Sequence, residues 1–218
     1  MIKKEKKMIK KVYNQQEFNT AIESGITGIE IVGFVAELHG SSNAELHGSS
    51  SAVLYDTSSA VLYDTSSARL NDSSSAVLRG SSRAVLHDSS SAELYDSSNV
   101  VLYNSSRAVL RGSSRADLNN SSRADLHDSS RAVLRGSSRA DLNDSSSADL
   151  YNSSNARLYD SSRTDLYGSS RAVLYGTSSA ELHGSSRAVL HDFSVAWCYH
   201  NNTVINHGKG VVIPMFNN

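Results

Sequence analysis

The sequence predicts an all-β protein, a parallel β-solenoid with a short capping helix at its N-terminal end. Alanine recurs every eight residues from Ala36 to Ala196, with only Val100 and Thr164 in its place. Leucine follows two residues later in all twenty octads of residues 36–195, and no insertion or deletion interrupts the period. Self-similarity at a short fixed period is typical of stacked architectures, in which each repeat mainly contacts its neighbours.

Composition and charge narrow the functional classes. The chain of 218 residues has a formal net charge of −1, so no global field attracts nucleic acid or an anionic membrane. Its single cysteine, Cys198, can form no internal disulfide, which fits a reducing compartment. Residues 1–13 are basic and no apolar run follows them. We therefore expect a solvated basic tail without a secretory signal or membrane span, and a cytoplasmic protein.

Residues 14–35 are expected to cap the N-terminal end, because an open sheet edge would pair with other strands. Asn14 is a suitable helix N-cap with Glu17 three residues on, and Gly25 is a suitable stop. An apolar strand over residues 26–35 then leads into the first octad.

Each octad of residues 36–195 is predicted to form one short strand and one corner. We number its positions one to eight from Ala36. Positions one (Ala) and three (Leu) are apolar between mostly polar neighbours, which is the period of a half-buried strand. Position five is always Asp, Gly or Asn, which tolerate a positive φ, so it is the predicted corner. Position seven is always Ser and is predicted to point inward and stack as a ladder.

Two octads are expected to make one coil of 16 residues with two facing sheets. A triangular coil of three octads is the alternative, but Ala and Leu would leave its centre empty. Twenty octads then make ten coils, a rod of about 48 Å at ~4.8 Å per coil. Parallel crossovers favour a right-handed winding.

The Ala-x-Leu core resembles that of pentapeptide-repeat proteins, where a small residue two places before a central leucine also points inward. The closest segments are Ala116-Asp117-Leu118, Ala124-Asp125-Leu126 and Ala140-Asp141-Leu142. The resemblance covers three residues in eight, the period differs, and it implies a solenoid. Some members of that family mimic DNA with an acidic surface. The octads here carry 14 Arg against 18 Asp and Glu, which is too balanced for such a mimic.

Residues 196–218 lose the octad pattern and are expected to form a C-terminal cap. The alternative is a self-association surface that uses Trp197, Tyr199 and Phe216, and the sequence leaves both open.

No catalytic or metal-binding motif is present in the sequence. The GxSxG, P-loop, HExxH and GxGxxG patterns are all absent, and octads without long loops predict no concave site. Position five exchanges Asp for Gly, so a carboxylate metal ladder is not expected. The histidines at position four are never sixteen residues apart, so they are expected to be solvated. They are His39, His47, His87, His127, His183 and His191. We therefore predict no enzyme, no cofactor and no metal.

Eight tyrosines also occupy position four. We expect Tyr151 to stack on Tyr167, and Tyr159 on Tyr175, because residues sixteen apart share a face. Cross-strand pairing that stabilises the sheet is one role for these rings. An aromatic platform for a flat ligand is the other.

Arginines at position eight precede aspartates at position two in four octads. We expect local opposite-charge pairs there, which would serve solubility and strand register. The pairs are Arg115 with Asp117, Arg123 with Asp125, Arg139 with Asp141 and Arg163 with Asp165.

The sequence thus predicts a non-enzymatic structural or scaffolding rod that acts through its shape and through end-to-end or lateral association with itself. The alternative is a binding module that presents a Tyr- and His-bearing face to a glycan or a protein. An ice-binding face is a distant third, because threonine is rare in the octads. Nucleic-acid and membrane partners are not expected.

Overall fold

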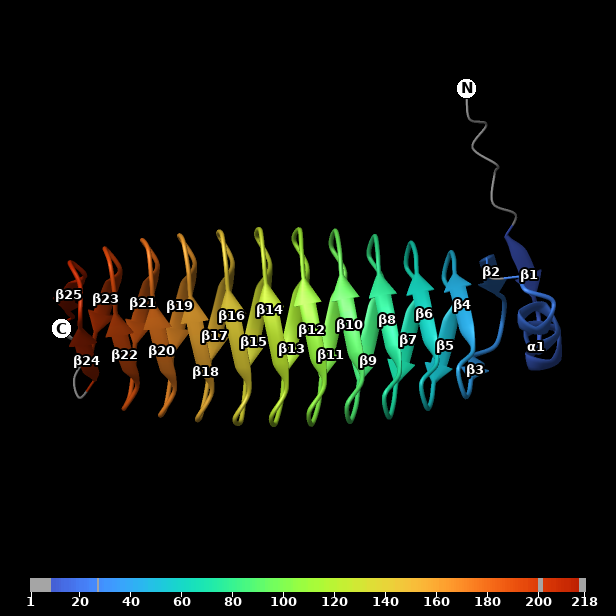
Figure 1. The fold of residues 1–218 in the computed structure, drawn as a ribbon, viewed down its shortest axis with the longest axis horizontal. Coiled ribbons are helices and arrows are strands. Elements are labelled where there is room, and N and C mark those ends of the chain that lie inside the picture. Colours follow the sequence, from blue (N-terminus) through green and yellow to red (C-terminus); the bar gives the residue numbers. More distant parts are fainter. Residues whose placement is uncertain (1–8, 27, 200–201, 216–218) are drawn as a thin grey trace, which may run out of the picture.

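The computed structural model describes residues 9–26, 28–199 and 202–215, which form a parallel β-solenoid with one short helix (Figure 1). Two parallel sheets of 13 and 12 strands lie back to back, and the chain alternates between them. The strands of the 13-stranded sheet are β1 (Lys10–Val12), β2 (Gly28–Ile31), β4 (Asn43–Leu46), β6 (Ser59–Leu62), β8 (Ser75–Leu78), β10 (Ser91–Leu94), β12 (Arg107–Leu110), β14 (Arg123–Leu126), β16 (Arg139–Leu142), β18 (Asn155–Leu158), β20 (Arg171–Leu174), β22 (Arg187–Leu190) and β24 (Thr203–Asn206).

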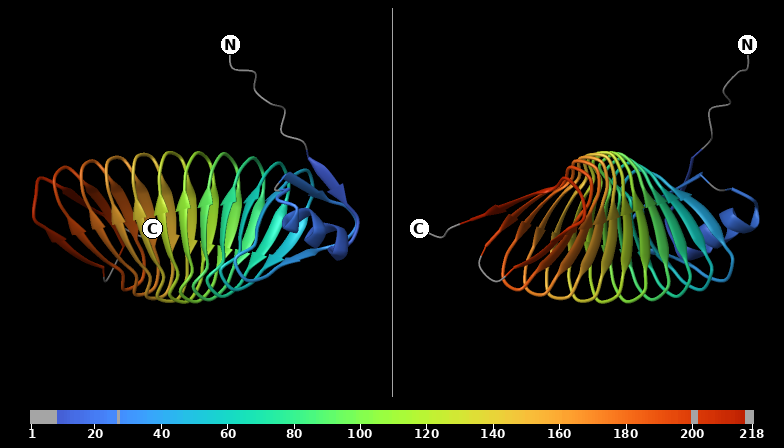
Figure 2. Two further views of the ribbon diagram at one scale, coloured as in Figure 1. Left: turned by 45° about the vertical axis from the view of Figure 1, so that its right-hand side comes forward. Right: turned by 60° about the vertical axis from the view of Figure 1, so that its left-hand side comes forward.

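The 12-stranded sheet has the same spacing. Its strands are β3 (Ala36–Leu38), β5 (Ser51–Leu54), β7 (Ser67–Leu70), β9 (Arg83–Leu86), β11 (Asn99–Leu102), β13 (Arg115–Leu118), β15 (Arg131–Leu134), β17 (Ser147–Leu150), β19 (Arg163–Leu166), β21 (Ser179–Leu182), β23 (Val195–Cys198) and β25 (Val211–Pro214). From β3 and β4 onward, neighbouring strands pair residue i with residue i+16, as Ala108 does with Ala124. At the N-terminal end the offset is 19 residues between β1 and β2 and 17 residues between β2 and β4. The predicted coil of two octads is therefore confirmed. Figure 2 shows that the stack of coils is twisted along its length, as sheets of L-residues are.

The core is a thin layer of Ala and Leu between the two sheets. Every octad leucine from Leu38 to Leu190 is at most 1% exposed. The serines at position seven from Ser50 to Ser194 are fully buried as well, so their inward orientation is confirmed. Most of their hydroxyls donate within the turn to the carbonyl three residues earlier, as Ser66 does to Tyr63 at 2.6 Å. This bond satisfies a polar group that burial would otherwise make costly.

All twenty residues at position five have a positive φ, as predicted. Eight are glycines and twelve are Asp or Asn, with φ between 54° and 61° for the latter. Several aspartates also accept a hydrogen bond from the corner of the preceding coil. The Gly112 amide, for example, donates to the Asp128 carboxylate at 2.9 Å. Either Asp or Gly can occupy the corner because both adopt its positive φ. An aspartate also adds a hydrogen bond between neighbouring coils.

Helix α1 (Gln15–Glu23) lies at the N-terminal end of the rod (Figure 1). Asn14 is its N-cap and accepts from the Glu17 amide, and the Glu17 carboxylate accepts from the amide of Tyr13, one residue before the position used in a capping box. The Gln15 side-chain amide pairs with the backbone of Glu37 in the edge strand β3, accepting at 2.9 Å and donating at 3.0 Å. Gln15 thus takes the place of a neighbouring strand at this position.

The solenoid extends beyond the octads at both ends. Lys10–Val12, which the sequence assigns to a basic tail, forms β1 and pairs with β2. Residues assigned to a C-terminal cap form β23, β24 and β25, which continue both sheets in register. Thirteen strands at ~4.8 Å make the rod roughly 58 Å long, longer than the ten coils counted from the octads.

A corner substitution tests the positive-φ requirement. Asn152 has a φ of 61° and its side chain makes no hydrogen bond among the described residues. Asn152→Ala should lower the free energy of unfolding by about 1 kcal/mol, because alanine adopts the left-handed region less readily than asparagine. Asn152→Gly should be close to the parent in the same urea titration. Equal losses in both variants would mean that the side chain matters and the backbone angle does not.

Candidate functional site

Position four places aromatic rings in a column along each edge of the rod. Tyr151 and Tyr167 stack with centroids 4.9 Å apart, and Tyr159 and Tyr175 stack at 5.2 Å, as expected from their spacing. Arg79 lies over the Tyr95 ring at 4.7 Å. In the described chain these rings belong to the first residue of the turn after each strand. The stacking of successive coils therefore brings rings sixteen residues apart next to each other.

The columns are longer than the tyrosines alone predict. His183 stacks on Tyr167 at 4.8 Å and Tyr199 stacks on His183 at 4.5 Å. In the other column His191 stacks on Tyr175, and His207 stacks on His191 at 5.5 Å. Treating tyrosine and histidine separately hid these four-ring columns. A search for any aromatic residue sixteen positions from another would have found them.

Stacking determines what the columns can offer to a ligand. Their rings are within 8° of parallel over the tyrosine pairs, so each inner ring has both faces covered by its neighbours. A ligand can reach ring edges and hydroxyls, but it cannot lie on an inner face. Burial and the nearby Asp165 raise the pKa of Tyr167, so its hydroxyl, which is protonated at neutral pH in any case, stays a hydrogen-bond donor further into the alkaline range.

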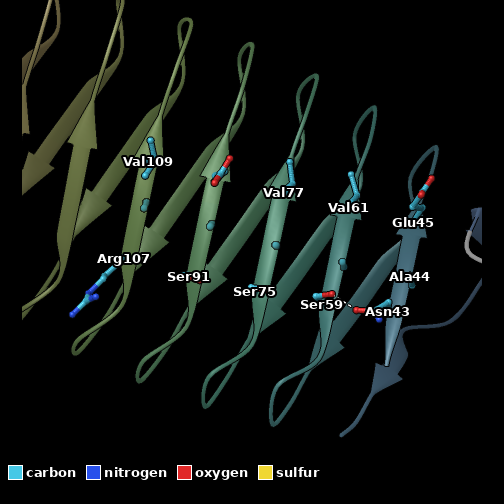
Figure 3. Close-up of a pocket in the computed structure, with 15 residues that line it drawn as sticks. Asn43, Ala44, Glu45, Ser59, Val61, Ser75, Val77, Ser91, Arg107 and Val109 are labelled. Carbon is cyan, nitrogen blue, oxygen red and sulfur yellow. Dashed lines mark hydrogen bonds between the residues drawn. The ribbon is translucent and has the colours of Figure 1, made fainter. Parts of the chain in front are cut away.

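A groove runs along the outer face of the 13-stranded sheet. Its walls are the side chains at positions eight and two, and its floor is the backbone at the intervening alanines. Figure 3 shows these two rows over the N-terminal half, with Asn43, Ser59 and Ser75 on one wall and Val61 and Val77 on the other. The C-terminal half of the groove has a volume of about 820 Å³.

The groove explains why the predicted Arg-x-Asp pairs do not form. Among the described residues, none of the four arginines makes an ion pair with the aspartate two positions later. Side chains two apart on a strand both stand off the sheet and leave the space over the alanine open between them. Asp141 instead lies 4.0 Å from Arg157 on the neighbouring strand β18.

The two outer faces carry opposite charge in their C-terminal halves. From β12 to β24, the 13-stranded sheet carries six arginines and two aspartates at positions eight and two. Over the same two positions from β13 to β23, the 12-stranded sheet carries three arginines against four acids, and three of these acids form the column Asp149, Asp165 and Glu181. Burial and the adjacent carboxylates raise the pKa of Asp149 and of Asp165. The neutral net charge of the chain therefore conceals a cationic and an acidic face.

The C-terminal end of the rod is open. Val212 is in register with the buried Ala196, yet it is 42% exposed because no further coil covers it. Ile205 is 49% exposed on the last strand of the other sheet. Trp197 lies on the outer face of β23 between Glu181 and Ile213, and so flanks this end without forming it.

The predicted association surface also included Tyr199 and Phe216. Tyr199 belongs to an aromatic column, and Phe216 is outside the described residues. Within residues 9–26, 28–199 and 202–215, no group of three or more His, Cys, Asp or Glu is arranged to hold a metal ion. Over the same residues, no helix has the length and apolar character needed to cross a membrane.

The acidic column predicts a pH-dependent stability. Because the raised pKa of Asp165 disfavours its charged form in the fold, its penalty is present at neutral pH. The penalty disappears as the pH falls through the raised pKa toward the ordinary value of 3.8. Asp165→Asn should therefore raise the thermal midpoint at pH 7, and its advantage should shrink on acidification.

Asp117→Asn is the matched control for this experiment. Asp117 occupies the same repeat position on the same sheet, but its neighbours in the column are Val101 and Val133. Its removal relieves no repulsion within the column, so the midpoint should change less. An equal gain in both variants would contradict the role of the adjacent carboxylates.

Comparison with known proteins assigns no family to this chain. No protein-family model, curated protein or solved structure matches it.

Proposed function

We propose that this protein is a non-enzymatic structural rod that associates with a second copy through its C-terminal end. The observation that carries the proposal is the difference between its two ends. The N-terminal end has a helix over it and a side-chain amide paired with the edge strand β3. Among the described residues, the C-terminal end leaves Val212 42% exposed at a core position of the last coil, while Val211 and Ile205 are exposed at outer-face positions of the two terminal strands.

The regular turns support a structural role over a catalytic one. Every connection between β3 and β23 has four residues, so no longer loop is available to enclose a substrate. Enzymes need a concave, water-excluding site, and the groove on this rod is open along its length. The Ala-x-Leu likeness to pentapeptide-repeat proteins fits the same proposal as a likeness of architecture.

The unequal ends favour a closed pair over a filament. Head-to-tail stacking would require the C-terminal strands of one copy to meet the covered N-terminal end of the next, and helix α1 lies there. Two C-terminal ends can instead meet around a two-fold axis, which closes the assembly at two copies. The pair would be a rod of twice the length with a covered end on both sides.

Pro214 restricts which strands can meet. In a parallel sheet, the N–H and the C=O of one residue point toward the same neighbouring strand. The Cys198 carbonyl points toward β25, because it accepts from the Met215 amide at 2.8 Å. Pro214 is in register with Cys198, so its backbone points one strand further on, to the open edge. Proline has no N–H, so β25 lacks this donor at the open edge. Strand β24 keeps its donors, so we assign the pairing to β24 of both copies.

A charge at the centre of the open end tests the association. In sedimentation equilibrium the full chain should show a mass above the 23.5 kDa of one copy. This mass should depend on concentration, because an interface with the area of one coil is small and binds weakly. Val212→Asp should return the mass to one copy, since a buried unpaired carboxylate is costly. Val101→Asp is the control, because position two of the same sheet carries Asp in other octads. A parent chain that is monomeric at all concentrations would overturn the proposal.

A further inference from the structure

The groove on the 13-stranded sheet carries a column of arginines that the fold does not need. Position eight holds one arginine per coil at five of the six strands from β12 to β22, with Asn155 at the sixth, and all five are exposed. The column consists of Arg107, Arg123, Arg139, Arg171 and Arg187. Serines occupy the same position in the same sheet at β6, β8 and β10, with the same backbone pairing.

Only the N-terminal part of this column has acids beside it, because the charge of Arg123 acts on Asp141 across the groove. None of its five arginines forms an ion pair within the described chain. Consecutive members, such as Arg171 and Arg187, lie directly opposite each other on paired strands at ~4.8 Å, where like charges repel. Since serine would remove the repulsion and keep the strand, the column is better explained by a partner than by folding.

The opposite wall of the groove changes from acidic to apolar along the rod. Asp125 and Asp141 face the column at β14 and β16, but after Asp141 the wall contains no acid. It continues with Arg157, Val173 and Val189. The stretch from β20 to β22 therefore has the guanidinium groups of Arg171 and Arg187 on one side and the side chains of Val173 and Val189 on the other.

We propose that this stretch binds a linear anionic polysaccharide along the rod axis. The acidic substituents would meet Arg171 and Arg187, and the C–H faces of the sugar rings would pack on Val173 and Val189. Successive arginines are spaced by one strand, about 4.8 Å, which is close to the span of one pyranose ring. A polymer with a charge on each sugar can thus keep step with the column over several coils.

Other polyanions fit this groove less well. Single-stranded nucleic acid is bound by stacking its bases on aromatic faces, and the inner rings of both aromatic columns have their faces covered. The open groove also presents apolar side chains next to its cations, which a uniformly polar phosphate chain would leave unused. The proposal does not depend on association through the C-terminal end.

The experiment measures binding of size-defined heparin oligosaccharides to the full chain by calorimetry, with neutral dextran as a second probe. Arg171→Ser combined with Arg187→Ser should weaken heparin binding about tenfold, because two adjacent charge contacts are lost. The control is Arg115→Ser combined with Arg131→Ser. These two arginines pair with each other at the same repeat position on the opposite sheet. The control should weaken binding less than twofold.

The matched variants decide between a groove site and general charge attraction. Both remove two positive charges, and both install the residue found at this position in other octads, so thermal melting should confirm two folded proteins. Equal weakening by the two double variants, or no heparin binding by the parent, would overturn the proposal. So would dextran binding of equal strength, or tighter binding of a thymidine oligonucleotide with the same number of charges.

Discussion

The backbone ladder that places each residue on the residue sixteen positions later is the constraint on which the rest of the structure depends. It requires the chain to turn every eight residues, which the positive φ at position five provides. The turn also buries the serine hydroxyl of position seven. In most coils this hydroxyl donates to a carbonyl of its own turn, which offsets the cost of its burial. Leucine and alanine then only have to fill the thin space between the sheets.

In-register stacking puts like side chains next to like, and the consequences differ by residue type. Leucines, serines and aromatic rings gain from the arrangement because each packs on a similar neighbour. Charged columns lose, as the raised pKa of Asp149 and of Asp165 shows. A column of like charges therefore lowers the stability of the fold, and folding by itself gives no reason for it. The arginine column and the acidic column lie on opposite sheets, which gives a rod of almost neutral net charge two different faces.

The ends of the rod show how a repeat is stopped. At the N-terminal end, Gln15 pairs its side-chain amide with Glu37, and lysines lie on the short edge strand β1. At the C-terminal end the leucine position is taken by Asn206 and by Pro214, the only proline of the chain. Asn206 bonds to the backbone at Gly208 and Gly210, and so supports the last turn. These replacements end the repeat but leave Val212 uncovered, which is the basis of the proposed association.

The sequence by itself determined the coil and its contents. Fixed Ala, Leu and Ser positions with an Asp, Gly or Asn corner place the alanines, leucines and serines on the inner side of each strand and turn, so the period, the register and the buried serines could all be predicted. Only the tertiary structure decided where the rod begins and ends, because β1, β24 and β25 lack the octad signature, yet they extend the backbone ladder and add apolar residues such as Val12 and Val204 to the core. It also decided the electrostatics. Arg115 and Asp117 are close in sequence but stand apart across an open groove, whereas the contacts that matter come from strands sixteen residues away, since a sheet brings neighbours together across the ladder and not along the strand.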